Sequence, residues 1–169
     1  MARAILIGPP GSGKSTVGKA LAKSLGVEWV DTDQRIEERA GKKISDIFIE
    51  DGEPLFRQME EEVVSQSLSS VTGVLSLGGG AIMSEPTQQL LAPLKKEIIL
   101  LEVSISQAAP RVGFNKERPL LAVNPRQAWQ ALMEKRTPIY KKLAGFTIST
   151  DSLKPQEVAE KIAEYLESQ

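Results

Sequence analysis

The chain contains no cysteine and no histidine, and each absence excludes a class of chemistry. Without cysteine there is no disulfide bond, no thiol nucleophile and no cysteine-ligated metal. Without histidine the chain lacks the commonest general base near neutral pH and the commonest zinc ligand. Any catalysis must therefore depend on carboxylates, lysine, arginine and metal-bound phosphate.

Charge and hydropathy favour neither a nucleic acid nor a membrane as partner. The 21 Lys and Arg residues are balanced by 22 Asp and Glu residues, so the formal net charge is -1. We therefore expect no broad basic surface of the kind that binds DNA or acidic lipids. No apolar run approaches the roughly 20 residues that span a bilayer. Residues 1–8 lead directly into an apolar run, so we expect no signal peptide and a cytoplasmic protein.

The pattern of apolar residues predicts a single α/β domain over residues 1–169. Short apolar runs, typical of buried strands, occur at 4–7, 29–30, 74–77, 98–103 and 146–149. Helical spacing separates them, with apolar residues recurring at Val17, Leu21 and Leu25, at Leu55, Met59 and Val63, and at Val158, Ile162 and Leu166. Strands alternating with helices predict a parallel sheet that is covered on both faces.

Two regions interrupt this alternation. About residues 33–61 there is helical sequence without a strand, roughly twice the length that one crossover needs. About residues 112–124 the sequence is irregular and mixes charge, glycine and proline, and Asn124-Pro125 is typical of the cap and first turn of a following helix. We expect the first region to form a substrate pocket and the second a lid, although surface loops of no special function remain an alternative.

The stretch GPPGSGKST follows the first apolar run and matches the phosphate-binding pattern G-x-x-x-x-G-K-[ST]. Its glycines allow backbone N–H groups to surround phosphates at the positive end of a helix. Lys14 is expected to reach the β- and γ-phosphates and the Ser15 hydroxyl to bind Mg²⁺. We predict that ATP is held by Gly11, Ser12, Gly13, Lys14, Ser15 and Thr16.

The carboxylate that often completes a magnesium site is missing from the segment VLSLGGG, but Asp31 and Asp33 follow another strand. Two residues apart on an extended segment, their side chains would point toward one site. We assign Asp31 to Mg²⁺ through water and Asp33 to a substrate hydroxyl. The alternative is that one of them caps the helix that contains Ile36.

Four arginines are candidates for anion binding: Arg57, Arg111, Arg118 and Arg136. Singly, each fits a solvated surface position. Arg57 and Arg136 have apolar neighbours on the helices expected for them, so part-burial is expected to require an anionic partner. A substrate carboxylate would bind such guanidinium groups through two parallel hydrogen bonds.

Together the motifs GPPGSGKST, VDTD, FRQMEEE, LSLGGG, RPLL and MEKRTPIY resemble those of shikimate kinases in order and spacing. The resemblance runs from Ala4 to about Asp151 and implies a three-layer P-loop NTPase fold. That fold has a five-stranded parallel sheet in the order 2-3-1-4-5, helices on both faces, a substrate-binding insertion and a lid. The implied reaction transfers the γ-phosphoryl group of ATP, with Mg²⁺, to the 3-hydroxyl of shikimate, and the implied form is a monomer.

The resemblance also implies roles for single residues. Asp33 and the backbone of the run Gly78, Gly79 and Gly80 would hold the shikimate hydroxyls, and Arg57 and Arg136 would bind its carboxylate. Arg118, in the lid, would reach the transferring phosphate, and Arg111 would lie beside the adenine with the segment after Thr150. Lys14, Asp33 and Arg118 are therefore the expected catalytic residues.

Two other interpretations stay open. The same fold serves other small-molecule kinases, such as gluconate kinases, which also need to bind a carboxylate, and nucleotide kinases. A nucleotide-binding protein without activity is expected to have lost Lys14, Asp33 or Arg118, and all three are present.

Overall fold

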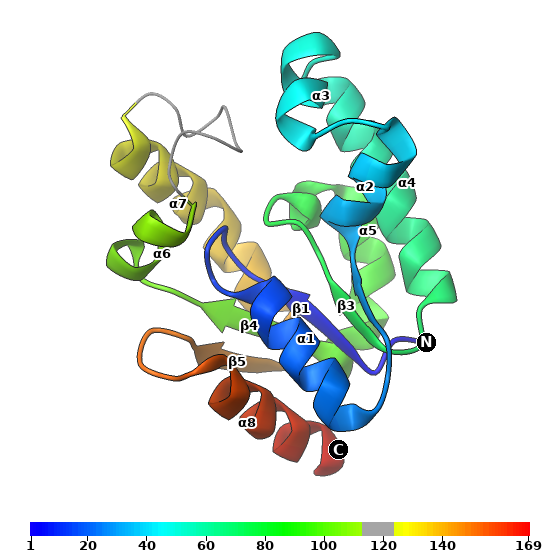
Figure 1. Cartoon of the computed structure of the whole chain (residues 1–169), viewed down its shortest axis with the longest axis vertical. Coiled ribbons are helices and arrows are strands. Elements are labelled where there is room, and N and C mark those ends of the chain that lie inside the picture. The colour runs from blue at the N-terminus through cyan, green and yellow to red at the C-terminus, as the bar shows by residue number, and fades with distance from the viewer. Residues whose placement is uncertain (113–123) are drawn as a thin grey trace.

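The protein is described by a computed structural model of residues 1–112 and 124–169, in which five parallel strands form one sheet (Figure 1). The strands are β1 (Ala4–Ile7), β2 (Trp29–Asp31), β3 (Val74–Ser76), β4 (Ile98–Glu102) and β5 (Phe146–Ser149). Their order is β2-β3-β1-β4-β5, which confirms the predicted α/β sheet. All of β1 and nearly all of β4 is buried, as expected for apolar strands covered on both faces.

Helices cover both faces of the sheet. Helices α1 (Lys14–Leu25) and α8 (Pro155–Glu167) pack on one face through Val17, Leu21, Val158 and Ile162. The other face is covered by α4 (Glu53–Ser70), α5 (Glu85–Leu91) and α7 (Pro125–Leu143). Because each crossover returns to a parallel neighbour, the loops after the strands gather at one edge of the sheet, where ligands of such folds bind.

The predicted insertion consists of the helices α2 (Thr32–Ala40) and α3 (Ile44–Glu50) and the first half of α4. It has an apolar cluster of its own, formed by Ile36, Ile44, Ile47, Phe56 and Val63. This cluster holds α2, α3 and the first half of α4 together.

The apolar stripe expected on α4 is confirmed at Val63 and in part at Met59, but not at Leu55. The helix buries Phe56, Glu60, Val63, Val64 and Ser67, whereas Leu55 is 42% exposed. The reason is that α4 packs on α2 and α3 with its first half and on the sheet with its second half. The spacing of three apolar residues does not reveal that the two halves of one helix pack on different partners.

The remaining elements are short. After β3 come η1 (Ala81–Met83), α5 and η2 (Ala92–Glu97), and after β4 comes α6 (Ile105–Val112). The helix predicted at Asn124-Pro125 begins at Pro125, but the Asn124 side chain bonds to Gln127 instead of capping the backbone. The predicted lid, about residues 112–124, lies outside the described residues except at its two ends.

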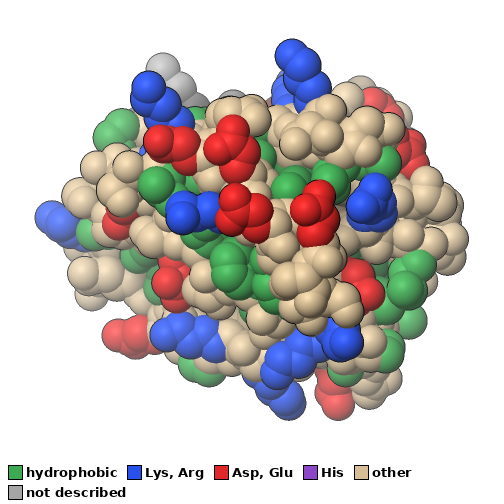
Figure 2. All heavy atoms as spheres, turned by 90° about the horizontal axis from the view of Figure 1, so that it is seen from below, with side chains coloured by type: hydrophobic (Ala, Val, Ile, Leu, Met, Phe, Trp, Pro, Cys, Tyr) green, Lys and Arg blue, Asp and Glu red, His purple; other side chains and the backbone are tan. Residues whose placement is uncertain are grey.

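The charge distribution on one face of the molecule and the hydropathy of its helices can be compared with the balanced composition. On the face shown in Figure 2, basic and acidic side chains are interspersed and no large patch of one sign is visible. Among the described residues, no helix combines the length and the apolar character that a membrane span requires.

Candidate active site

The phosphate loop joins β1 to α1 and is shaped by glycines. Gly11 and Gly13 have φ of 78° and 91°, in the left-handed region that favours glycine, and Gly13 directly precedes the helix. The Lys14 ammonium donates to the carbonyl oxygens of Gly8, at 2.8 Å, and Pro9, at 3.0 Å. The lysine therefore lies along its own loop, at the open end of α1, where unpaired backbone N–H groups favour an anion.

One cavity of about 380 Å³ lies at this loop. It brings together most of the predicted nucleotide and metal residues with one predicted substrate residue: Gly11, Gly13, Lys14, Ser15, Thr16, Asp31, Asp33 and Arg111. Arg111 reaches it from α6 and donates to the Gly11 carbonyl at 3.0 Å. Ser12 is different, because its side chain is fully buried and its amide donates to the Pro9 carbonyl.

Asp31 and Asp33 both line this cavity, but the reason given from the sequence is wrong. Only Asp31 is extended; the chain enters α2 at Thr32, so Asp33 lies in the first helical turn. Asp31 is also the N-cap of α2, since its Oδ1 accepts from the Asp33 amide at 2.8 Å. Asp31 therefore both caps α2 and lines the cavity, so the two alternatives considered for it are both correct.

The second oxygen of Asp31 faces the phosphate loop. Ser15 Oγ donates to Asp31 Oδ2 at 2.9 Å. Mg²⁺ binds oxygen atoms at 2.0–2.1 Å in an octahedron, so neighbouring ligands lie about 2.9 Å apart. The separation of Ser15 Oγ and Asp31 Oδ2 is compatible with the spacing of oxygen atoms around such an ion. Among residues 1–112 and 124–169 no cluster of three or more acidic side chains could hold a metal by itself.

The electrostatics of Asp31 favour a bound cation. Burial of the Asp31 carboxyl, followed by repulsion from Asp33, raises its pKa above the ordinary value. Hydrogen bonds from Ser15 and from the Asp33 and Gln34 amides act in the opposite direction without cancelling the shift. A cation beside Asp31 would remove this penalty.

The strand that lacks a carboxylate has a hydroxyl in its place. Ser76 Oγ accepts from Trp29 Nε1 at 3.0 Å and donates to the Lys14 carbonyl at 3.2 Å. Ser76 thereby ties β2, β3 and the first turn of α1 together. Its side chain is fully engaged in packing the phosphate loop against the sheet.

A second group of predicted residues converges on Gly80. A Cβ atom placed on Gly80 would lie 2.5 Å from Nη1 of Arg57 and 2.9 Å from Nη2 of Arg136. Arg57 projects from α4 and Arg136, which is 4% exposed, from α7. The two predicted arginines therefore meet at one point, over a backbone that only a glycine leaves open.

The glycine run has a different role at each position. The Gly78 amide already donates to Thr32 Oγ1, so it is not free for a substrate. A Cβ on Gly78 would lie 2.5 Å from Asp33 Oδ1 and 3.0 Å from Glu60 Oε2. Within the described part of the chain, Gly79 and Gly80 donate no backbone hydrogen bond. Gly78 thus makes room for two carboxylates, and a side chain on Gly79 or Gly80 would meet the arginines.

Three residues of this group were not predicted from the sequence. Glu60, 4% exposed, accepts from Arg57 Nη1 at 2.8 Å, and Glu53 lies 3.4 Å from Arg57 Nε. Tyr140, one turn after Arg136, donates its hydroxyl hydrogen to the Gly79 carbonyl. Glu60 follows Arg57 by three residues and Tyr140 follows Arg136 by four. Residues at these spacings share a helix face, so the sequence did contain a signal that they lie beside the two arginines.

The adenine end is only partly described. Thr150 Oγ1 donates to the Ser12 carbonyl at 2.9 Å, so the segment after β5 is fastened to the phosphate loop. Arg118 lies outside the described residues, and its predicted role stays a prediction. The described residues thus form two adjoining halves, a phosphate-binding loop and an anion-binding corner at Gly80, with Asp33 between them.

Comparison with known proteins gives one consistent result. Residues 10–167 match the family model described as shikimate kinase. A shikimate kinase of Thermobifida fusca is 53% identical over 163 residues, covering 96% of this chain and 94% of the relative. One of Salinispora arenicola is 48% identical and covers 96% of each chain. The solved structure "Shikimate kinase from Acinetobacter baumannii in complex with shikimate" superposes with a TM-score of 0.91 at 37% identity, covering 98% of this chain and 92% of that one.

Proposed function

Since the chain belongs to the shikimate kinase family, we propose that its site transfers the γ-phosphoryl group of ATP to the 3-hydroxyl of shikimate. The products are shikimate 3-phosphate and ADP. The protein is thus a phosphotransferase with an alcohol acceptor. The observation that carries the assignment of the acceptor is the meeting of Arg57 and Arg136 at Gly80, beside Asp33 and the phosphate loop.

Arg57 and Arg136 bind the shikimate carboxylate in this proposal. Two guanidinium groups at one point repel each other, and a carboxylate between them removes that cost while accepting bidentate hydrogen bonds. Glu60 accepts a hydrogen bond from Arg57 Nη1 at 2.8 Å and so fixes the guanidinium group beside the glycine run. The backbone of Gly79 and Gly80 and the carboxylate of Asp33 bind the hydroxyls of the same ring in this proposal.

Asp33 orients the attacking hydroxyl. It lines the same cavity as Lys14 and lies against Gly78, so it is within reach of both halves of the site. The chain has no histidine, so no imidazole competes with Asp33 as acceptor of the hydroxyl proton. Phosphoryl transfer demands little covalent work, so orientation and charge stabilisation account for most of the catalysis.

Lys14 stabilises the charge of the transferring group. In the described conformation its ammonium is held by two carbonyl oxygens, and these contacts are exchanged for phosphate oxygens when ATP binds. Arg111 lies at the rim of the same cavity, on the side where the adenine is expected, and Arg118 joins from the lid. Gly11, Ser12, Gly13, Ser15 and Thr16 complete the ATP site.

Ser15 and Asp31 hold Mg²⁺. When bound there, the ion would supply positive charge that offsets the charge of the phosphates. The chain's own contribution is a hydroxyl and a carboxylate 2.9 Å apart at the mouth of the phosphate loop. We further propose that the enzyme acts as one kinase domain, as a monomer and in the cytoplasm, without nucleic acid or membrane partners.

The direct test is ADP release with ATP and Mg²⁺, comparing shikimate with gluconate and with nucleoside monophosphates. We expect release that depends on shikimate, with shikimate 3-phosphate identified by mass spectrometry. Gluconate also has a carboxylate, so its failure as acceptor would show that the hydroxyl contacts at Asp33 decide the choice. Absence of shikimate-dependent ADP release would refute the proposal. Equal ADP release with all acceptors would refute the assignment of Arg57 and Arg136 to the shikimate carboxylate.

Variants separate the two halves of the site. Asp33→Ala and Arg57→Ala should abolish transfer while ATP still binds, as measured by calorimetry. Arg57→Lys keeps the charge but loses the bidentate geometry, so it should raise the KM for shikimate. Arg39→Ala on α2 is the matched control, because Arg39 forms an exposed ion pair with Glu62. Near-normal turnover of Asp33→Ala would contradict the role of Asp33.

A further inference from the structure

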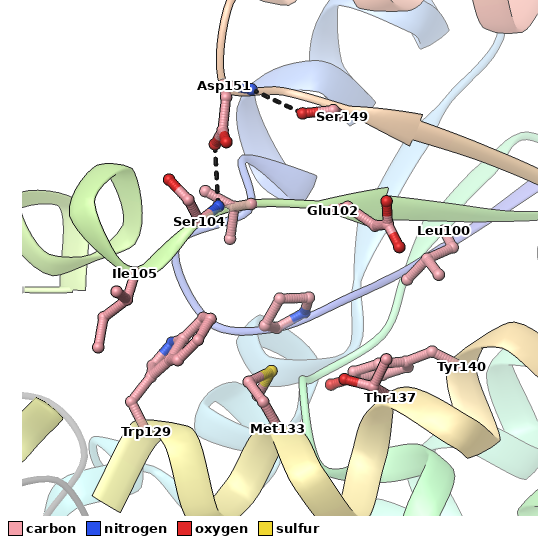
Figure 3. A pocket seen from close by; sticks show the side chains of 12 residues that line it. Leu100, Glu102, Ser104, Ile105, Trp129, Met133, Thr137, Tyr140, Ser149 and Asp151 are labelled. Atoms are coloured by element: carbon pink, nitrogen blue, oxygen red, sulfur yellow. Dashed lines mark hydrogen bonds between the residues drawn. The ribbon is translucent and has the colours of Figure 1, made fainter. Parts of the chain in front are cut away.

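The phosphate loop is held to the strands on both sides of β1. On the side of β4 and β5, Thr150 Oγ1 donates to the Ser12 carbonyl at 2.9 Å. A cavity of about 420 Å³, which lies between α7 and the ends of these strands, borders the loop there at Pro9 (Figure 3). On the side of β3, Ser76 Oγ donates to the Lys14 carbonyl at 3.2 Å. Ser76 thus joins the sheet to the first turn of α1.

Trp29 sets the direction in which the Ser76 hydroxyl donates. An indole N–H can only donate, and Trp29 Nε1 donates to Ser76 Oγ at 3.0 Å. A serine hydroxyl has a single hydrogen, and the contact with Trp29 uses a lone pair of the oxygen, not that hydrogen. Ser76 is buried, so the hydrogen goes to the Lys14 carbonyl and not to water. The three groups therefore form a chain of hydrogen bonds with one direction.

Helix α1 has no side chain at the point where the indole approaches it. A Cβ placed on Gly18 would overlap the Trp29 indole nitrogen and would lie 2.9 Å from Ser76 Oγ. Gly18 is buried in α1, one turn after Lys14. Glycine is a poor helix former, but a larger residue here would push the indole away from Ser76. The contact between Trp29 and Ser76 therefore requires glycine at position 18.

The hydrogen bond to the Lys14 carbonyl acts on Ser15. The Lys14 carbonyl and the Ser15 amide belong to one planar peptide unit, which ends at the Ser15 Cα. Holding that oxygen therefore fixes the plane from which the Ser15 side chain projects. Ser15 Oγ in turn lies 2.9 Å from Asp31 Oδ2. Two residues of β2 thus act on the first turn of α1, Asp31 directly and Trp29 through Ser76.

From these contacts we propose that Ser76, oriented by Trp29, is a positioning residue for the Mg²⁺ site. It keeps Ser15 Oγ and Asp31 Oδ2 at a separation that suits the ion, and it thereby sets the affinity for Mg²⁺ in the nucleotide complex. Ser76 does not ligate the ion, because its oxygen is buried and engaged in both hydrogen bonds. The inference rests on the Mg²⁺ site of the proposed function and is independent of the alcohol that accepts the phosphate.

Binding of a non-hydrolysable ATP analogue, measured by calorimetry, tests this proposal without any acceptor. The Kd is determined in EDTA and at saturating Mg²⁺, and the ratio of the first value to the second measures how strongly Mg²⁺ tightens nucleotide binding. Ser76→Ala keeps a small buried side chain and removes the hydroxyl. We expect it to lower the ratio about five-fold, as for one lost hydrogen bond, while the Kd in EDTA stays within about two-fold of the wild type.

A second variant and a control test the route. Trp29→Phe keeps a ring but removes the donor that orients Ser76, so it should also lower the ratio, and it should add nothing to Ser76→Ala. Ser67→Ala is the matched control, because Ser67 is buried and accepts from Arg35 Nη1 at 3.0 Å, but lies on α4. It should lower Tm without changing the ratio. If Ser76→Ala fails to fold, Trp29→Phe compared with Ser67→Ala decides the question.

The outcomes are distinguishable. A ratio lowered by Ser76→Ala and Trp29→Phe but not by Ser67→Ala supports the proposal. A Kd that rises equally with and without Mg²⁺, or a ratio that Ser67→Ala lowers as much, would leave Ser76 with a structural role alone and overturn it. A ratio lowered by Ser76→Ala alone would overturn the role of Trp29. A wild-type ratio of one would refute Mg²⁺ binding at Ser15 and Asp31, and this inference with it, whereas a failure to phosphorylate shikimate would refute only the assigned acceptor.

Discussion

Arg57 and Arg136 come from helices far apart in the sequence and meet over the same backbone atom. Nη1 of Arg57 and Nη2 of Arg136 lie 2.5 Å and 2.9 Å from the position that a Gly80 Cβ would occupy. Glu60 accepts a hydrogen bond from the same Nη1 atom of Arg57 at 2.8 Å. In the proposed function, this relationship makes Gly80 the floor of the site for the shikimate carboxylate.

Gly80→Ala should damage acceptor binding without preventing folding. Gly80 has φ of -97°, which alanine adopts freely, but the new methyl group would displace both guanidinium groups. We expect the KM for shikimate to rise at least ten-fold, with the KM for ATP within about two-fold of the wild type. Steady-state kinetics check this, and the ATP value is the internal control. An unchanged KM for shikimate would place the carboxylate elsewhere.

Tyr140→Phe should loosen the glycine run selectively. The variant keeps the buried ring and removes the hydroxyl that bonds to the Gly79 carbonyl. One lost hydrogen bond corresponds to about 1 kcal/mol, so the KM for shikimate should rise roughly five-fold. Tyr165→Phe is the matched control, because Tyr165 stacks on Phe146 on the opposite face of the sheet. Equal effects of the two variants would contradict a positioning role for Tyr140.

Asp31→Asn should stabilise the metal-free protein and weaken catalysis. The raised pKa means that the folded state holds the Asp31 proton more tightly than the unfolded chain. Ionisation of Asp31 therefore costs stability, and the cost appears as pH rises through the raised pKa. Asparagine lacks the charge and still caps α2. We expect Tm at pH 7 without Mg²⁺ to rise by about 2 °C.

The pH dependence supplies the control for this variant. Near pH 3, below the ordinary pKa of aspartate, Asp31 is protonated in both states, so the difference in Tm should vanish. Turnover at limiting Mg²⁺ should fall for Asp31→Asn and recover in part when Mg²⁺ is raised. A Tm at pH 7 below that of the wild type would show that the charge of Asp31 is compensated in the metal-free protein.

Lys14→Met should reduce turnover by about two to three orders of magnitude, the usual loss for an electrostatic stabiliser of a transition state. The change removes the ammonium now held by the Gly8 and Pro9 carbonyls. Lys23→Met, in the last turn of the same helix, is the matched control for loss of a charge. Single-turnover measurements of shikimate phosphorylation distinguish the two variants. A loss of turnover below ten-fold would contradict the role of Lys14.

Much of the fold and half of the site were predictable because the signals are local. The strand–glycine–helix order around Lys14 and the apolar runs of the five strands are patterns of neighbouring residues. The site residues that were missed depend on phase and packing. The run of three glutamates after Met59 does not reveal that Glu60 is the buried one. Which side of α4 is buried depends on how the helix packs against α2 and α3.

The sequence alone determined the phosphate loop, the alternation of strands and helices, and a family whose members carry these motifs in this order. Tertiary structure decided which atoms meet: Arg57 with Arg136 over Gly80, Ser15 with Asp31, and Tyr140 with Gly79. The physical reason is range, since backbone preferences act over a few residues, whereas a binding corner forms only when distant helices dock on one sheet.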